Sequence, residues 1–122
     1  MSDLTELEDA VNRIRARDSR YAQELYPFIM AGLEYTYRQQ GECRHVSGGE
    51  LVQGLCSFAK EQFGIMALTI LRQWGIRSTA DFGAAVYQLI DEGILTRQEG
   101  DELSDFDNVL DLCDTLETRY FD

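Results

Sequence analysis

The spacing of apolar residues along the 122-residue chain predicts a succession of amphipathic helices. The clearest pattern covers residues 79–91, where Phe82, Ala85, Val86 and Leu89 recur at intervals of three and four positions, as on one face of a helix. Similar patterns predict helices at about 4–16, 23–39, 47–63 and 109–120. The chain is therefore expected to fold as helices that share one core.

Residues 65–74 are apolar on almost every side, and a helix without a polar face is normally buried. We therefore expect this segment to be the central element of the fold. Its predicted core consists of large apolar residues from several helices: Leu55, Phe58, Leu68, Leu71, Trp74, Phe82, Val86 and Leu89. Residues 1–17 offer only a thin apolar stripe, which predicts a loosely packed N-terminal helix.

Helix starts are predicted from capping boxes, in which Ser or Thr is followed three positions later by Asp or Glu. The hydroxyl accepts a hydrogen bond from the first turn while the carboxylate accepts one from the cap residue. Four such pairs occur: Thr5–Glu8, Ser47–Glu50, Ser78–Asp81 and Thr96–Glu99. Glycines follow several of the predicted helices, as expected for residues that end a helix.

Residues 95–107 are compatible with two structures. One is a short helix that begins at Thr96, and the other is a two-stranded β-wing that turns at 98–101. With a wing, the fold would be winged-helix-like, with 79–91 as its recognition helix. That helix contains no Lys or Arg, so it could not enter a groove lined by phosphates. The predicted class is all-α: one domain over 1–122, with five to six helices and the β-wing left open.

Acidic residues are concentrated at the C-terminal end of the chain. Of the formal net charge of −11, residues 91–122 carry −9, from eleven acids and two arginines. Nucleic acids and anionic membrane surfaces are bound through Lys and Arg, so we expect neither as a partner. The acidic C-terminal segment favours a basic protein partner, and a solvated surface that maintains solubility is the simpler alternative.

The sequence predicts a cytoplasmic protein. No apolar stretch approaches the ~20 residues of a membrane-spanning helix, and the first twenty residues lack the apolar region of a secretory signal. Cys43, Cys56 and Cys113 are an odd number without paired spacing, which suits a reducing compartment.

No residue pattern points to catalysis, a cofactor or a metal. His45, the only histidine, and Cys43 supply two ligands where zinc takes three or four from the protein. The aspartates of 101–111 do not match a calcium-binding EF-hand loop, because other residues stand where the loop needs its Gly and Glu. Gly48 and Gly49 lack the remainder of a phosphate-binding loop. We therefore predict a non-enzymatic protein without catalytic, cofactor-binding or metal-binding residues.

Four segments together resemble a known group of proteins. They are residues 44–48 (RHVSG), 62–64 (QFG), 74–83 (WGIRSTADFG) and 89–95 (LIDEGIL). They are similar to an uncharacterised family of short proteins from planctomycetes and verrucomicrobia. The resemblance covers residues 18 to about 115 and is most specific at 74–83. It implies no activity, cofactor or catalytic residue.

The sequence thus leads to the hypothesis of a protein–protein interaction or adaptor module. The candidate contact residues are Trp74, Arg77, Asp105, Asp107, Asp111, Asp114 and Glu117. Trp and Arg are residue types that anchor interfaces, and the acids would attract a basic partner. Two alternatives remain open. One is an acidic mimic of nucleic acid, and the other is a small enzyme or ligand-binding domain with a pocket near Trp74 and His45.

Overall fold

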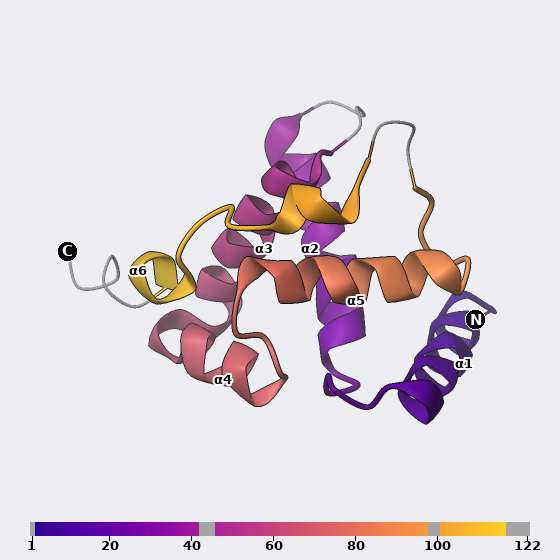
Figure 1. Cartoon of the computed structure of the whole chain (residues 1–122). Helices are drawn as coiled ribbons and strands as arrows, with labels where there is room; N and C mark the ends of the chain where they lie inside the picture. Colours follow the sequence, from indigo (N-terminus) through magenta and orange to yellow (C-terminus); the bar gives the residue numbers. More distant parts are fainter. Residues whose placement is uncertain (1, 42–45, 98–100, 117–122) are drawn as a thin grey trace.

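In a computed structural model of the chain, residues 2–41, 46–97 and 101–116 are described, and within them the fold is all-helical (Figure 1). The elements are α1 (Ser2–Arg17), α2 (Leu25–Gln40), α3 (Gly48–Phe63), the 3-10 helix η1 (Gly64–Met66), α4 (Ala67–Gln73), α5 (Thr79–Asp91), the 3-10 helix η2 (Leu103–Phe106) and α6 (Leu112–Leu116). The predicted all-α class is confirmed.

The prediction of a β-wing at 95–107 is wrong for the part of this segment that the structure describes. No strand occurs there, and Leu103–Phe106 instead forms the 3-10 helix η2. The backbone amide of Glu102 donates to Oδ2 of Asp105 at 3.0 Å and stabilises the start of this helix. Phe106 at its end is only 5% exposed. Burial of this ring holds the segment against the helices, so the winged-helix-like arrangement does not form.

The centre of the fold is made by α2, α3 and α5. Helices α2 and α3 pack against each other, and α5 runs across both (Figure 1). Small residues allow the close approach of α2 and α3, because a Cβ added to Gly32 or Gly54 would collide with Leu55 or Thr36, respectively. Of the eight predicted core residues, six are buried: Leu55, Leu68, Leu71, Phe82, Val86 and Leu89. Phe58 and Trp74 are only partly buried against this core.

The prediction that 65–74 is the central buried helix is wrong. Ile65 and Met66 form part of η1 and are 60% and 50% exposed. Helix α4 follows them at the edge of the molecule, beside α3 and α6 (Figure 1). It buries Ala67, Leu68 and Leu71. An edge position leaves one side of the helix in water even where that side is apolar.

Two of the predicted capping boxes mark helix starts correctly. The backbone amide of Glu50 donates to Oγ of Ser47 at 3.1 Å, and the amide of Ser47 donates to Oε1 of Glu50 at 3.0 Å. At α5, the amide of Ser78 donates to Oδ2 of Asp81 at 3.1 Å. These bonds satisfy backbone donors that have no partner within the helix.

Helix α1 is attached to the end of α5 by ion pairs. Oε1 of Glu92 lies 2.6 Å from Nε of Arg13, and Oε2 lies 2.7 Å from Nη1 of Arg17. The buried side chains of α1 are Ala10, Val11 and Ile14. Thr5 lies inside α1, so its predicted role as a cap is wrong, and the predicted box at 96–99 extends outside the described residues.

The links α1–α2 and α4–α5 are joined to each other. The amide of Ala22 donates to the carbonyl of Trp74 at 3.1 Å, and the buried Tyr21 hydroxyl donates to Oδ1 of Asp81 at 2.7 Å. Burial and this bond raise the pKa of Tyr21 above its ordinary value. Gly75 has φ +101°, and a Cβ there would lie 2.9 Å from the Tyr21 ring. Glycine is therefore required for the two links to meet.

Candidate functional site

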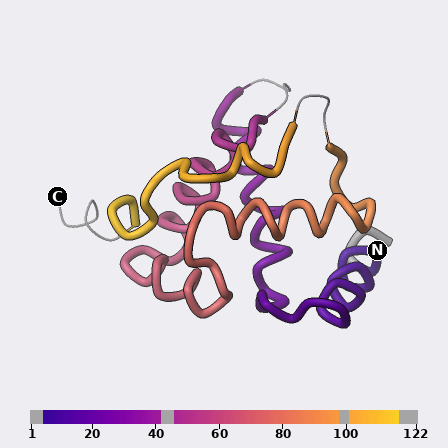
Figure 2. Tube along the Cα trace, in the orientation of Figure 1, coloured from indigo at the N-terminus to yellow at the C-terminus, as the bar shows by residue number. Residues whose placement is uncertain are grey.

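The acidic C-terminal part of the described chain lies across the helical core. We call residues 101–116 the strap; it contacts α5, α3 and α4 (Figure 2). Its buried side chains are Phe106, Leu112 and Leu116. The amide of Val109 donates to Oγ1 of the buried Thr79 at 3.2 Å. The strap is therefore anchored to the core at several points.

Phe106 fits against two glycines. A Cβ added to Gly83 of α5 would lie 2.7 Å from Cβ and Cγ of Phe106, and one added to Gly48 of α3 would lie 3.2 Å from its ring. Carbon atoms in normal contact are about 3.5–4.0 Å apart. Both glycines thus leave room for Phe106, and no pattern in the sequence linked these three residues.

The predicted acidic contact residues lie on the outer side of the strap. Asp105, Asp107, Asp111 and Asp114 are all exposed. The carboxylate of Asp111 accepts a hydrogen bond from the amide of Asp114 at 3.0 Å, at the start of α6. Glu117 lies outside the described residues. On the inner side, Leu112 and Leu116 are buried and Val109 is partly buried against the core.

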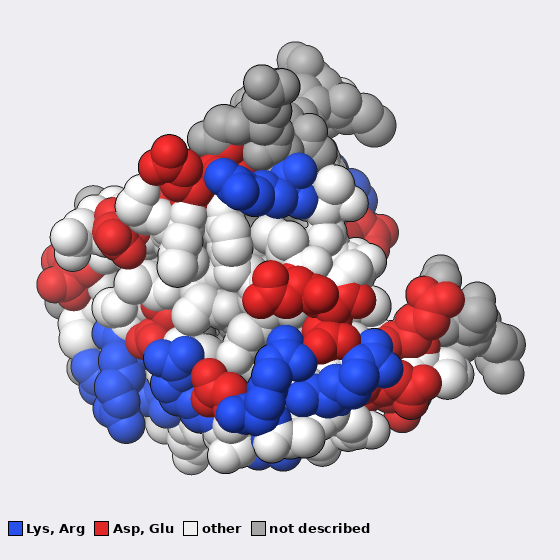
Figure 3. All heavy atoms as spheres, turned by 45° about the vertical axis from the view of Figure 1, so that its right-hand side comes forward, with Lys and Arg blue, Asp and Glu red and all other residues white. Residues whose placement is uncertain are grey.

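Basic side chains are placed differently. Figure 3 shows Lys and Arg gathered mainly along one edge of the molecule, next to acidic side chains. The pairs of Arg13 and Arg17 with Glu92, and of Arg20 with Asp18, belong to this intermixed arrangement. The Arg pairs hold the pKa of Glu92 below its ordinary value, since both guanidinium groups donate hydrogen bonds to it.

Trp74 and Arg77 do not join the strap. The Trp74 ring packs edge-on against Phe28 and Phe63, with ring centroids 5.4 and 5.7 Å away. Arg77 is exposed, and its backbone amide donates to Oδ2 of Asp81 at 2.8 Å. Of the predicted contact residues, Trp74 thus belongs to an aromatic cluster, and the four described aspartates belong to the strap.

The sequence predicts no metal-binding or catalytic site, and the structure describes only some of the residues on which this prediction depends. Cys43 and His45 lie outside the described residues. Within the described ranges, no group of three or more His, Cys, Asp or Glu side chains is placed to hold a metal ion. Burial raises the pKa of the Cys56 thiol to about 12, so this thiol is protonated and unreactive at neutral pH.

A pocket opens between the strap and the helices. We call it the strap pocket; its empty space, including the open mouth, is about 570 Å³. Its walls come from α2, residues 46–47 and the start of α3, α5, and residues 95–96 and 101–106. Its main apolar lining residues are Leu33, Leu51, Val86, Ile90, Leu95 and Phe106, and its acidic ones are Asp101, Glu102 and Asp105. Trp74 does not line it. Sequence analysis missed this pocket because its walls come from four separate segments.

Tyr87 gives the strap pocket an unusual polar group. The residue lines the pocket, and its ring meets that of Phe106 edge-on with centroids 6.5 Å apart. Its hydroxyl is buried and has no hydrogen-bond partner among the described residues. Buried hydroxyl groups are nearly always hydrogen-bonded. The phenol oxygen thus lacks the hydrogen bond that a buried hydroxyl normally makes.

Comparison with known proteins gives no assignment. The chain matches no protein-family model, no curated protein and no solved structure. The resemblance to the planctomycete and verrucomicrobial proteins stays a prediction. Within the described residues, no helix has the length and apolar character needed to cross a membrane.

Proposed function

We propose that this chain is a non-enzymatic adaptor module that binds a basic segment of another protein through the acidic strap. The observation that carries this proposal is the division of the strap into two sides. Phe106, Leu112 and Leu116 are buried in the core, whereas Asp105, Asp107, Asp111 and Asp114 are exposed. A surface held in this way presents its charges in fixed positions.

The charge of the strap favours a basic partner. Residues 101–116 contain six carboxylates and no Lys or Arg. Such a field attracts cationic segments and repels nucleic acid. Because the acids lie on an anchored segment, ordering this side of the complex costs less conformational entropy than ordering a free tail. We propose a cytoplasmic setting for this interaction.

The test replaces the four exposed strap aspartates with asparagine: Asp105, Asp107, Asp111 and Asp114. Asparagine keeps the side-chain oxygens that stabilise helix starts. The probe is a fluorescein-labelled peptide in which arginine alternates with glycine, and its anisotropy gives Kd. We expect the variant to bind about tenfold more weakly, since each exposed ion pair contributes roughly 0.2–1 kcal/mol.

A matched control separates position from total charge. Four exposed acids elsewhere, Glu8, Asp9, Glu24 and Glu61, are converted to Gln or Asn, which changes the net charge by the same amount. The control should bind the peptide nearly as well as the parent. Equal weakening of both variants would show that the peptide responds to overall charge, and the proposal would then be lost.

A further inference from the structure

We propose that the strap pocket receives an arginine side chain of the partner's basic segment. This inference rests on the proposed function and specifies the chemistry that the partner must carry. An arginine combines an aliphatic stem with a planar cationic head that carries five N–H donors. The strap pocket offers a matching feature for each of these parts.

The walls of the strap pocket suit the stem. Leu33, Val86 and Ile90 lie on its helical side, and Phe106 lies on the strap side. Long basic side chains bury their methylene groups on such surfaces while keeping the charged end near polar groups. The aromatic rings of Tyr87 and Phe106 also line the pocket, and a guanidinium is attracted to aromatic rings.

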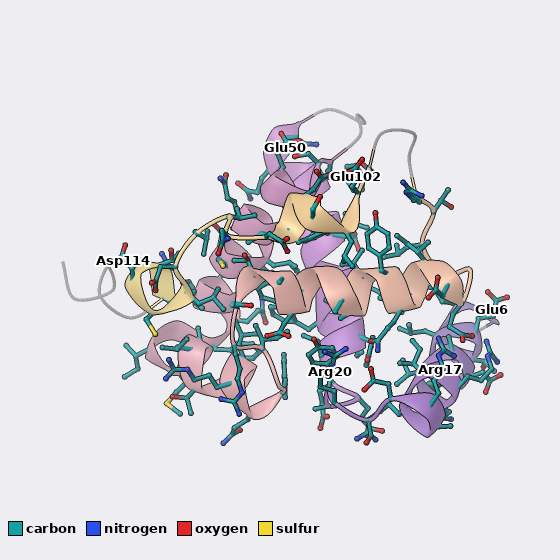
Figure 4. All side chains as sticks on the ribbon, viewed as in Figure 1. Glu6, Arg17, Arg20, Glu50, Glu102 and Asp114 are labelled. Carbon is teal, nitrogen blue, oxygen red and sulfur yellow. The ribbon has the colours of Figure 1, made fainter. Side chains whose placement is uncertain are left out.

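The rim of the strap pocket suits the charge. Glu102 and Asp105 are exposed lining residues. Figure 4 shows Glu102 on the strap, at the same end of the molecule as Glu50 of α3. Arg97 is a base near this rim, and its Nε donates to the carbonyl oxygen of Asp101 at 2.7 Å. The exposed carboxylates of Glu102 and Asp105 favour a cation at the rim.

The hydroxyl of Tyr87 distinguishes arginine from lysine. It is buried and without a partner among the described residues, so a donor that reaches it restores a missing hydrogen bond. A guanidinium has enough N–H groups to serve this oxygen and a rim carboxylate together, whereas an ammonium is a compact point charge. Arginine therefore satisfies both features at once.

The test compares the arginine–glycine peptide with a lysine–glycine peptide of equal length and charge. We expect the parent chain to bind the arginine peptide about tenfold more tightly, as a hydrogen bond to a charged group can supply. Tyr87→Phe removes only the hydroxyl and should bring the two affinities within about twofold. Tyr35→Phe, whose ring does not line the strap pocket, should leave the preference intact.

The position of the arginine site is tested by NMR, in a titration of ¹⁵N-labelled parent protein with N-acetyl-arginine methylamide. Changes in amide chemical shift should concentrate at strap-pocket residues such as Val86, Tyr87 and Phe106. Equal affinity for both peptides, or shift changes confined to another surface, would overturn the inference while leaving the adaptor proposal standing. Failure of both peptides to bind would instead remove the adaptor proposal, and the arginine site with it.

Discussion

Replacing Gly83 with alanine should destabilise the protein, although the opposite is expected of an ordinary helix position. Alanine in a helix interior is more favourable than glycine by about 1 kcal/mol. At Gly83, however, the new Cβ would lie 2.7 Å from Cβ and Cγ of Phe106. The shortfall from normal contact is about 1 Å, and both Cβ atoms are fixed to backbone. The strap must therefore move outward.

The size of the effect follows from two opposing contributions. Overpacking of this kind costs about 1–3 kcal/mol, and displacement of the buried Phe106 adds lost apolar burial. After subtracting the gain in helix propensity, we expect Gly83→Ala to lower the free energy of unfolding by about 1–3 kcal/mol. Urea denaturation followed by circular dichroism measures this change.

Gly49→Ala is the matched control, because nothing lies within 4 Å of a Cβ added at Gly49. It should leave stability unchanged or raise it by up to about 1 kcal/mol. In a Phe106→Ala background, the cost of Gly83→Ala should shrink, which a double-mutant cycle reveals as coupling. If Gly83→Ala is as stable as the parent, Phe106 is not held against α5 as described.

Two further changes test the helix cap and the attachment of α1. Ser47→Ala removes the acceptor for the Glu50 amide and should lower thermal stability, by about 0.5–2 kcal/mol; an unchanged melting temperature would contradict the observed start of α3. Glu92 has a lowered pKa beside Arg13 and Arg17. Its ionised carboxylate therefore stabilises the folded state above the unfolded pKa of about 4.3, and this stabilisation is lost as pH falls through the folded pKa. Glu92→Gln should therefore be less stable than the parent at pH 7 and equal to it in stronger acid, as followed by thermal melts across pH; a difference that persists in acid would assign the effect to packing.

The sequence was informative where local rules decide the structure. The box at Ser47 and Glu50 and the period of 79–91 depend on neighbours within one or two turns, and both gave correct helices. The apolar run at 65–74 was misplaced because composition does not reveal how many elements surround a helix. Ile65 and Met66 lie in η1, before α4 begins, and face solvent.

The strap and its pocket could not be predicted because they depend on contacts between distant residues. Phe106 is a single aromatic residue in an acidic stretch, and periodicity gives no weight to an isolated position. Its partners, Gly48 and Gly83, stand fifty-eight and twenty-three positions earlier in the chain. A glycine inside the predicted helix 79–91 was an unused signal, because glycine there disfavours the helix unless close packing requires it.

The anchoring of the strap affects the order in which parts of the fold can form during synthesis. Synthesis proceeds from the N-terminus, so Gly48 and Gly83 are added to the chain before Phe106, which packs against them. Until then, apolar side chains such as Leu51 and Val86, which line the strap pocket, have no cover from the strap. A chain that ends before residue 101 therefore leaves this apolar surface exposed, and exposed apolar surface of this kind promotes aggregation and chaperone binding.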